Sequence, residues 1–143
     1  MKFELTLEIK NATEEIGKRY GLKFIILHGS YAKGTQGPGS DLDIAVLGKH
    51  RIDGEEYLKI FGELEDVFGN NRERELDFKT LHNIDPLFRY QVIKDGVLLF
   101  GDPREYEEFR LYAYRDYEDS YDLRQLELHL LKKSIRATLK QYA

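Results

Sequence analysis

The chain has 143 residues, of which 41% are hydrophobic and 34% charged, a balance typical of one soluble domain with its own core. It contains no cysteine, which excludes disulfides, thiolate catalysis and cysteine zinc sites. The formal net charge of −4 argues against broad nucleic-acid binding, and no apolar run approaches the roughly 20 residues that span a membrane. The N-terminal residues mix Glu and Lys with apolar residues and lack a signal-peptide core, so we expect a cytoplasmic protein.

The first part of the chain predicts a helix, a strand, a loop and a second strand. Apolar residues at helical spacing predict a helix at 4–20. The short apolar runs 22–28 and 42–47 are β-prone and predict two strands. The intervening segment, 29–40, is rich in Gly and Ser and predicts a loop with one helical turn after Ser30.

The middle of the chain continues the alternation of helices and strands. An apolar stripe predicts a helix at 54–68, and alternating apolar and charged residues predict a third strand at 75–80. An Asp-Pro pair at 85–86 opens the next helix, because Asp caps a helix N-terminus and proline suits its first position. A short fourth strand follows at 97–100.

A second Asp-Pro pair, at 102–103, opens helical sequence that continues to the C-terminus, with a break expected near Asp119–Asp122. This order of elements predicts an α/β (α+β) fold in which a small mixed sheet of about four strands is flanked by helices. We expect one domain at 1–118 and a C-terminal helical extension of the same domain at 119–143.

The stretch HGSYAKGTQGPGSDLDI, between the first two strands, carries the chemistry. Residues two apart on a strand share a face, so Asp41 and Asp43 lie side by side and repel each other. A divalent cation between them would remove that penalty, and hard oxygen ligands in a chain without cysteine favour Mg²⁺.

Gly29 and Ser30 follow the first strand directly and predict a phosphate site. Glycine lets the backbone approach a ligand closely, and the free N–H groups of a helical turn with the serine hydroxyl can bind phosphate. In the same loop Lys33 can neutralise phosphate charge, although a solvated lysine is an equal alternative. Ser40 can orient the aspartates, and a turn-forming serine is the simpler alternative.

Asp77 is the candidate for a third carboxylate, which a two-metal phosphoryl or nucleotidyl transfer needs. It lies on the third predicted strand, on the face opposite Leu76 and Phe78, and an adjacent antiparallel strand would bring it beside Asp43. There it could bind metal and act as a general base toward an attacking hydroxyl.

The Gly-Ser pair, followed after ten residues by Asp-Leu-Asp, resembles the signature of the DNA polymerase β-type nucleotidyltransferase superfamily over residues 5–118. The short chain and the third acid in ELDF resemble its minimal nucleotidyltransferase branch. The resemblance implies two Mg²⁺ ions bound by Asp41, Asp43 and Asp77, and a nucleoside triphosphate held by Gly29 and Ser30.

Within that branch the chain most resembles antitoxins paired with HEPN-domain toxins. The resemblance implies transfer of AMP from ATP to a tyrosine of the toxin, in a hetero-oligomer or a homo-oligomer, without direct nucleic-acid binding. Two alternatives remain open: a nucleotidyltransferase for a small-molecule hydroxyl, as in the aminoglycoside enzymes, and a non-catalytic module that binds the toxin.

Three further features allow more than one interpretation. His28 could touch the nucleotide or be a structural histidine. A group of tyrosines could stack on a base, accept AMP or pack in a helix, and packing is favoured: Tyr106, Tyr112, Tyr114, Tyr117 and Tyr121. The stripe Leu128–Leu139 could dock a partner helix, pack on its own domain or form a homodimer.

Overall fold

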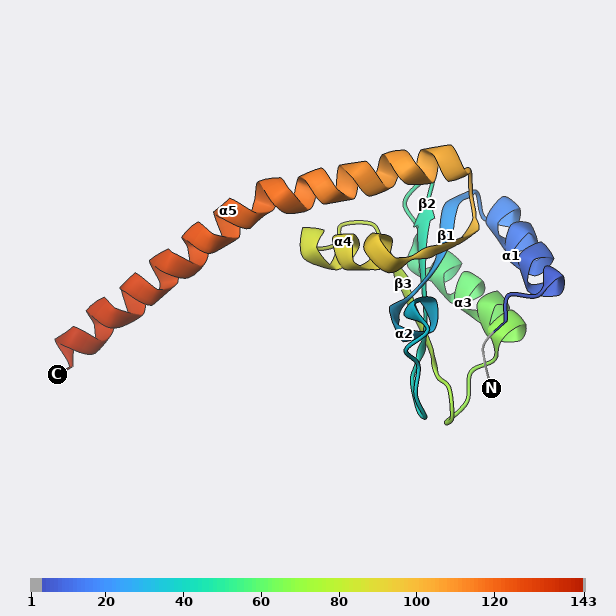
Figure 1. Cartoon of the computed structure of the whole chain (residues 1–143), viewed down its shortest axis with the longest axis horizontal. Helices are drawn as coiled ribbons and strands as arrows, with labels where there is room; N and C mark the ends of the chain where they lie inside the picture. Colours follow the sequence, from blue (N-terminus) through green and yellow to red (C-terminus); the bar gives the residue numbers. More distant parts are fainter. Residues whose placement is uncertain (1–3, 143) are drawn as a thin grey trace.

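The computed structural model of the chain describes residues 4–142. Its elements follow the predicted order: α1 Leu7–Arg19, β1 Leu22–His28, α2 Gly29–Lys33, β2 Leu42–Gly48, α3 Gly54–Phe68, β3 Leu76–Thr80, α4 Pro86–Asp95, β4 Val97–Phe100 and α5 Pro103–Gln141. The predicted mixed sheet flanked by helices is confirmed, and the single turn expected after the first strand is the short helix α2 (Figure 1).

The strands form one sheet in the order β3-β2-β1-β4. β1 runs antiparallel to both β2 and β4, whereas β3 runs parallel to β2. The expectation of an antiparallel neighbour for the third strand is therefore wrong. α3 crosses over the sheet between β2 and β3 and returns the chain to the end from which β2 starts, so the next strand runs in the same direction.

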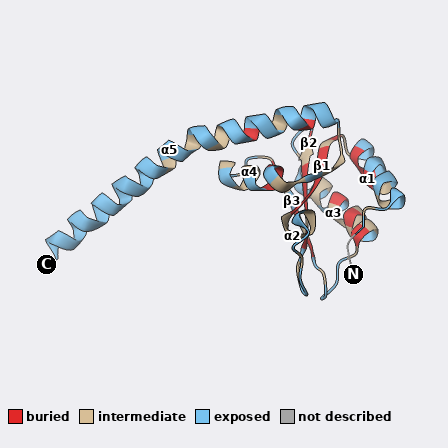
Figure 2. Cartoon of the chain, in the orientation of Figure 1, coloured by how far each residue is buried: buried red, intermediate tan, exposed pale blue. Residues whose placement is uncertain are grey.

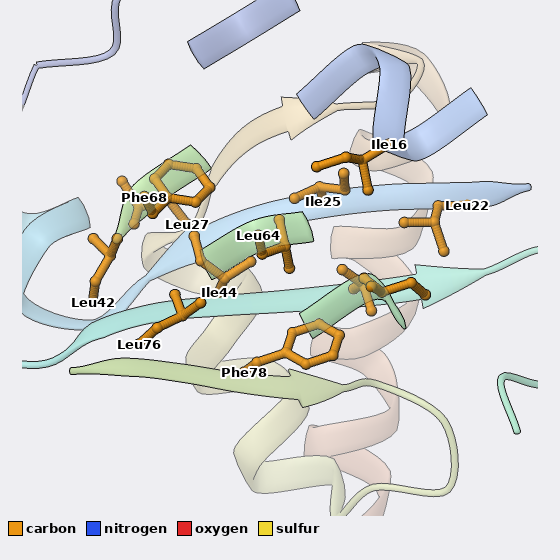
Figure 3. Close-up of a cluster of buried hydrophobic side chains, with 12 residues drawn as sticks. Ile16, Leu22, Ile25, Leu27, Leu42, Ile44, Leu64, Phe68, Leu76 and Phe78 are labelled. Carbon is orange, nitrogen blue, oxygen red and sulfur yellow. The ribbon is translucent and has the colours of Figure 1, made fainter. Parts of the chain in front are cut away.

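One face of the sheet carries the larger core, against α1 and α3 (Figure 3). Strand residues such as Ile25, Ile44 and Phe78 meet Leu64 of α3 and Ile16 of α1, and all five are almost fully buried. The Tyr57 hydroxyl of α3 donates a 2.8 Å hydrogen bond to the Phe78 carbonyl. This face therefore holds β2 and β3 at a fixed register.

The other face is covered by α4 and the first half of α5. Phe24 and Ala45 of the sheet pack there with Val92 of α4 and Tyr106 of α5. The Tyr106 ring meets Phe24 edge-on, with 5.4 Å between ring centroids, which confirms packing for this tyrosine.

α5 is one continuous helix, so the expected break near Asp119–Asp122 is wrong. The segment after Pro103 contains neither Gly nor Pro, and Ser120 stays in the helix by donating its hydroxyl to the Tyr117 carbonyl. From residue 125 to residue 142 every side chain is exposed, and the helix extends away from the domain (Figure 2). The stripe Leu128–Leu139 does not pack on its own domain.

Even this long helix is too polar to cross a bilayer, and no other helix among residues 4–142 has the length and apolar character to do so.

Gly17 of α1 provides a test of the packing between α1 and the sheet. A Cβ at this position would overlap the Phe100 ring, so Gly17→Ala is expected to destabilise the fold by about 1 kcal/mol or more despite its better helix propensity. Gly62→Ala in α3 is the matched control, because a Cβ there meets open space and should stabilise by about 0.5–1 kcal/mol. Urea unfolding measures the stability of both variants. A Gly17→Ala variant as stable as Gly62→Ala would contradict this packing.

Candidate active site

Three side chains stand in one row across the sheet, at the end where β2 and β3 begin. Within β1 and β2, His28 is the register partner of Asp43, and within β2 and β3, Asp43 is the partner of Asp77. The Leu42 N–H donates a 2.8 Å hydrogen bond to the Glu75 carbonyl, which fixes the start of this pairing. The structure thus places Asp77 beside Asp43, as the sequence predicts, although by a parallel register.

The Asp43 carboxyl is the electrostatic centre of the site. Its pKa is raised to about 6, first because burial disfavours its charge, and second because Asp77 adds negative charge and a side-chain hydrogen bond. Asp41, exposed just before β2, raises the Asp43 pKa further, whereas Lys79 lowers it. A cation bound between the two carboxyl groups would remove their mutual repulsion.

His28 is a buried neighbour of this pair. Burial lowers its pKa to about 4, against the opposing effect of the Asp77 charge, so the imidazole is neutral at physiological pH. Its ring meets the Phe88 ring edge-on at 6.2 Å, and its buried Nε2 has no hydrogen-bond partner in the described part of the chain. His28 also lines the pocket beside Gly29, and a contact of this histidine with a nucleotide stays a prediction.

Lys79 is a residue of the site that the sequence analysis missed. It lies two residues after Asp77 on β3, hence on the same face, and its Nζ lies 5.2 Å from the centre of the Phe88 ring. Its charge lowers the pKa of Asp43. The alternation that identified Asp77 carries the signal for this cation too.

The backbone conformation and the close neighbours of residue 29 both require glycine. Its φ is +72°, and a Cβ on it would overlap the Asp43 Oδ2 atom. Any other residue would therefore displace the central carboxylate as well as strain the backbone. Ser30 follows it in the first turn of α2, whose N-cap, His28, makes no side-chain hydrogen bond to the helix.

Lys33 and Ser40 have protein partners in the structure. The Lys33 ammonium lies 3.6 Å from Asp95 Oδ2 at the end of α4, and both side chains are partly exposed. The Ser40 hydroxyl accepts a 2.9 Å hydrogen bond from the Gly37 N–H, which is the turn-forming alternative. A contact of either residue with a nucleotide stays a prediction.

A pocket of about 520 Å³ opens beside Gly29, between α2, α4 and α5. Its walls include Lys33, Phe88, Gln91 and Tyr117, and the Tyr117 ring is stacked on Tyr90 at 4.7 Å. Phe88 and Gln91 could not be assigned from the sequence, because only the packing of α4 against α2 brings them to the site.

The carboxylates suit a magnesium ion that shares its ligands with a substrate, rather than a metal ion held by protein side chains alone. Among residues 4–142 no group of three or more His, Asp or Glu side chains converges tightly enough to hold a metal ion. The pair Asp43 and Asp77, with Asp41 nearby, matches the one or two carboxylates that hold Mg²⁺ when substrate phosphates complete its ligands. Burial and the neighbouring Asp77 raise the pKa of Asp43, and a cation bound to the pair would oppose that rise.

A mixed sheet that carries paired aspartates beside a Gly-Ser turn defines a nucleotidyltransferase, and the chain belongs to that family. The family described as polymerase beta, nucleotidyltransferase matches residues 10–105, which contain the three aspartates and the Gly29-Ser30 turn.

Two relatives have been named for their activity. MJ1547 of Methanocaldococcus jannaschii, provisionally named a protein adenylyltransferase, is 34% identical over 91 residues, which make up 64% of this chain and 65% of that protein. The chain thus spans just under two thirds of that relative's length. Protein adenylyltransferase MntA of Shewanella oneidensis is 29% identical over 97 residues, 68% of this chain and 67% of MntA.

Solved structures share the fold. A chain in a crystal structure of a toxin-antitoxin with AMP-PNP has a TM-score of 0.69 at 25% identity, over 86% of this chain and 98% of that one. A chain in the structure of tri-AMPylated Shewanella oneidensis HEPN toxin in complex with MNT antitoxin has a TM-score of 0.65 at 21% identity. The match covers 87% of this chain and 96% of that one.

The burial of the Asp43 carboxyl and its repulsion by Asp77 together predict a pH-dependent gain in stability for Asp43→Asn. Folding raises the Asp43 pKa from 3.8 to about 6, so the folded protein holds more protons in that window and loses stability as the pH rises through it. We expect the variant to match the wild type near pH 4 and to exceed its unfolding free energy by ~1–2 kcal/mol above pH 6, a figure discounted for solvent screening.

Urea unfolding at both pH values, with a chelator present, measures this difference. Asp66→Asn on the exposed side of α3 is the control, and it should show no such dependence on pH. A gain for Asp43→Asn that is the same at both pH values would contradict the raised pKa of Asp43.

Proposed function

We propose that this chain is an Mg²⁺-dependent protein adenylyltransferase, which transfers AMP from ATP to a tyrosine of a partner HEPN-domain toxin and so acts as its antitoxin. The observation that carries the proposal is the pairing of Asp43 with Asp77 directly against Gly29. Family membership and the names of the relatives support the reaction, and the toxin-antitoxin complexes among the structural neighbours support the partner.

The triphosphate would bind at the turn from β1 into α2. The glycine at 29 leaves room for it beside the Asp43 carboxylate, and the N–H groups at the start of α2 with the Ser30 hydroxyl donate to its oxygens. Lys33 would exchange its partly exposed Asp95 partner for a phosphate, and Ser40 would hold the loop that leads to Asp41.

Asp41, Asp43 and Asp77 would hold two Mg²⁺ ions with the phosphates. When bound, these ions neutralise phosphate charge and the charge of the departing pyrophosphate. The protein supplies the ligands at a position set by the β2–β3 register, so little reorganisation is needed when the substrate binds.

The chemical step is a displacement at the α-phosphorus. The acceptor hydroxyl oxygen forms a bond to this phosphorus, the bond from phosphorus to the bridging oxygen of pyrophosphate breaks, and pyrophosphate leaves with that electron pair. The hydroxyl proton passes to the Asp77 carboxylate, which stands at the edge of the carboxylate pair on the outer strand β3. The remaining catalysis is positioning of the two reactants.

Transfer of labelled AMP from ATP to the purified toxin tests the proposal. Asp77→Asn should lower the rate by about 100-fold or more, because it removes both a metal ligand and the proton acceptor, while toxin binding is retained. Label on an aminoglycoside but on no protein would favour the small-molecule alternative. Toxin inhibition without any transfer would favour the non-catalytic module.

Gly29→Ala gives a sharper test, because Gly34→Ala is a closely matched control. The two glycines have φ values of +72° and +74°, so alanine strains the backbone similarly at both. At position 29 the new Cβ overlaps Asp43, whereas at position 34 it meets open space. We expect transfer to be lost in Gly29→Ala and largely kept in Gly34→Ala, and equal losses would contradict a role for this contact.

Lys33→Ala is expected to raise KM for ATP up to about fivefold with a smaller effect on kcat, as suits a partly exposed charge pair. Lys94→Ala, which removes another lysine of the same pocket, is the control and should leave KM unchanged. Steady-state kinetics at varied ATP concentration separates the two.

A further inference from the structure

The second half of α5 is an exposed amphipathic helix. Its apolar stripe consists of Leu128, Leu131, Ile135 and Leu139, at steps of three and four residues, and each of these side chains is 45–64% exposed. Further steps of three or four residues lead back to Tyr117, which is half-buried, and to Ala113, which is buried in the core. The side of α5 that packs on the domain in the first half is thus exposed to solvent in the second half.

An uncovered helix of this kind needs a partner. The segment 125–142 is wholly exposed, and helices of this length have little stability in water without tertiary packing. Four large aliphatic side chains in one stripe also exceed the scattered apolar residues of an ordinary surface.

The charge along α5 points to what covers it. Residues 103–122 carry three basic and seven acidic side chains, a net −4, whereas residues 123–142 carry five basic and one acidic, a net +4. Lys132, Arg136 and Lys140 flank the stripe at four-residue spacing. Two second halves placed together would repel each other, whereas a second half placed on a first half is attracted.

The first half of α5 also offers an apolar place to dock. A groove of about 290 Å³ runs between α4 and α5, lined by Tyr90, Ile93, Leu111 and Tyr114, with Lys94, Glu107 and Arg110 beside them. Leu111 and Tyr114 are 50% and 46% exposed, so their side chains are available to a second molecule.

We propose that two copies of this chain pair through antiparallel α5 helices, with the basic second half of each copy seated on the acidic first half and the α4–α5 groove of the other. If the helices cross at residues 122 and 123, residue 131 of one copy lies opposite residue 114 of the second, and Arg136 lies near Glu107 of the second copy. Each pairing occurs twice, and the contact is closed by a twofold axis.

Analytical ultracentrifugation of the full chain tests the pairing at micromolar concentration. Leu131→Glu should weaken dimerisation at least about tenfold, equivalent to ~1.4 kcal/mol. Leu126→Glu is the matched control: its side chain is 51% exposed against 57% for Leu131, but it lies on the opposite side of the helix. A wild-type chain that stays monomeric, or equal dimerisation of the two variants, overturns the proposal.

Charge reversal distinguishes this arrangement from other pairings. One chain carries Lys132→Glu, Arg136→Glu and Lys140→Glu. A second chain carries Glu107→Lys, Glu118→Lys and Asp122→Lys, which share the side of α5 that borders the groove. Each chain alone should be monomeric, because like charges then face each other, whereas an equal mixture should form a heterodimer. Dimers of either chain alone, or a mixture that stays monomeric, contradict the proposal. A wild-type chain whose α5 binds only an acidic helix of another protein also contradicts it.

Discussion

The parallel register between β2 and β3 is the constraint on which the site depends. It makes Asp43 and Asp77 direct neighbours, and it does so at a cost, because burial and mutual repulsion raise the pKa of Asp43 to about 6. The larger core on the opposite face holds this register, since Ile44 and Phe78 alternate with the two aspartates and are buried against α3. The stability of one face of the sheet thus maintains the unfavourable charge arrangement on the other.

Glycine at position 29 completes that arrangement from the neighbouring strand. Its missing Cβ leaves space beside Asp43, and its left-handed backbone turns β1 directly into α2. A carboxylate pair, a nearby turn with free N–H groups and an open pocket therefore meet at one end of the sheet. This combination suits a substrate that brings both negative charge and metal, as a nucleoside triphosphate does.

α5 joins two functions of the fold in one element. Its first half closes the face of the sheet that carries the site and contributes Tyr117 to the pocket. Its second half carries an apolar stripe and the opposite net charge beyond the domain. Because the helix is continuous, its second half is joined to the pocket without an intervening loop.

The sequence by itself determined the elements and most of the candidate residues, because local patterns encode both. Alternating apolar and charged residues placed Asp77 on the polar face of β3. The spacing from Gly-Ser to Asp-Leu-Asp identified the loop and the first two aspartates. Only the tertiary structure decided the direction of β3, the continuity of α5 and the placement of Phe88 and Gln91 at the pocket. These features depend on how distant segments pack, since a crossover helix sets strand direction and no local residue pattern records which helix lies against which. The alternation along β3 places Lys79 on the face of Asp77, but its effect on the pKa of Asp43 arises only because β3 lies beside β2.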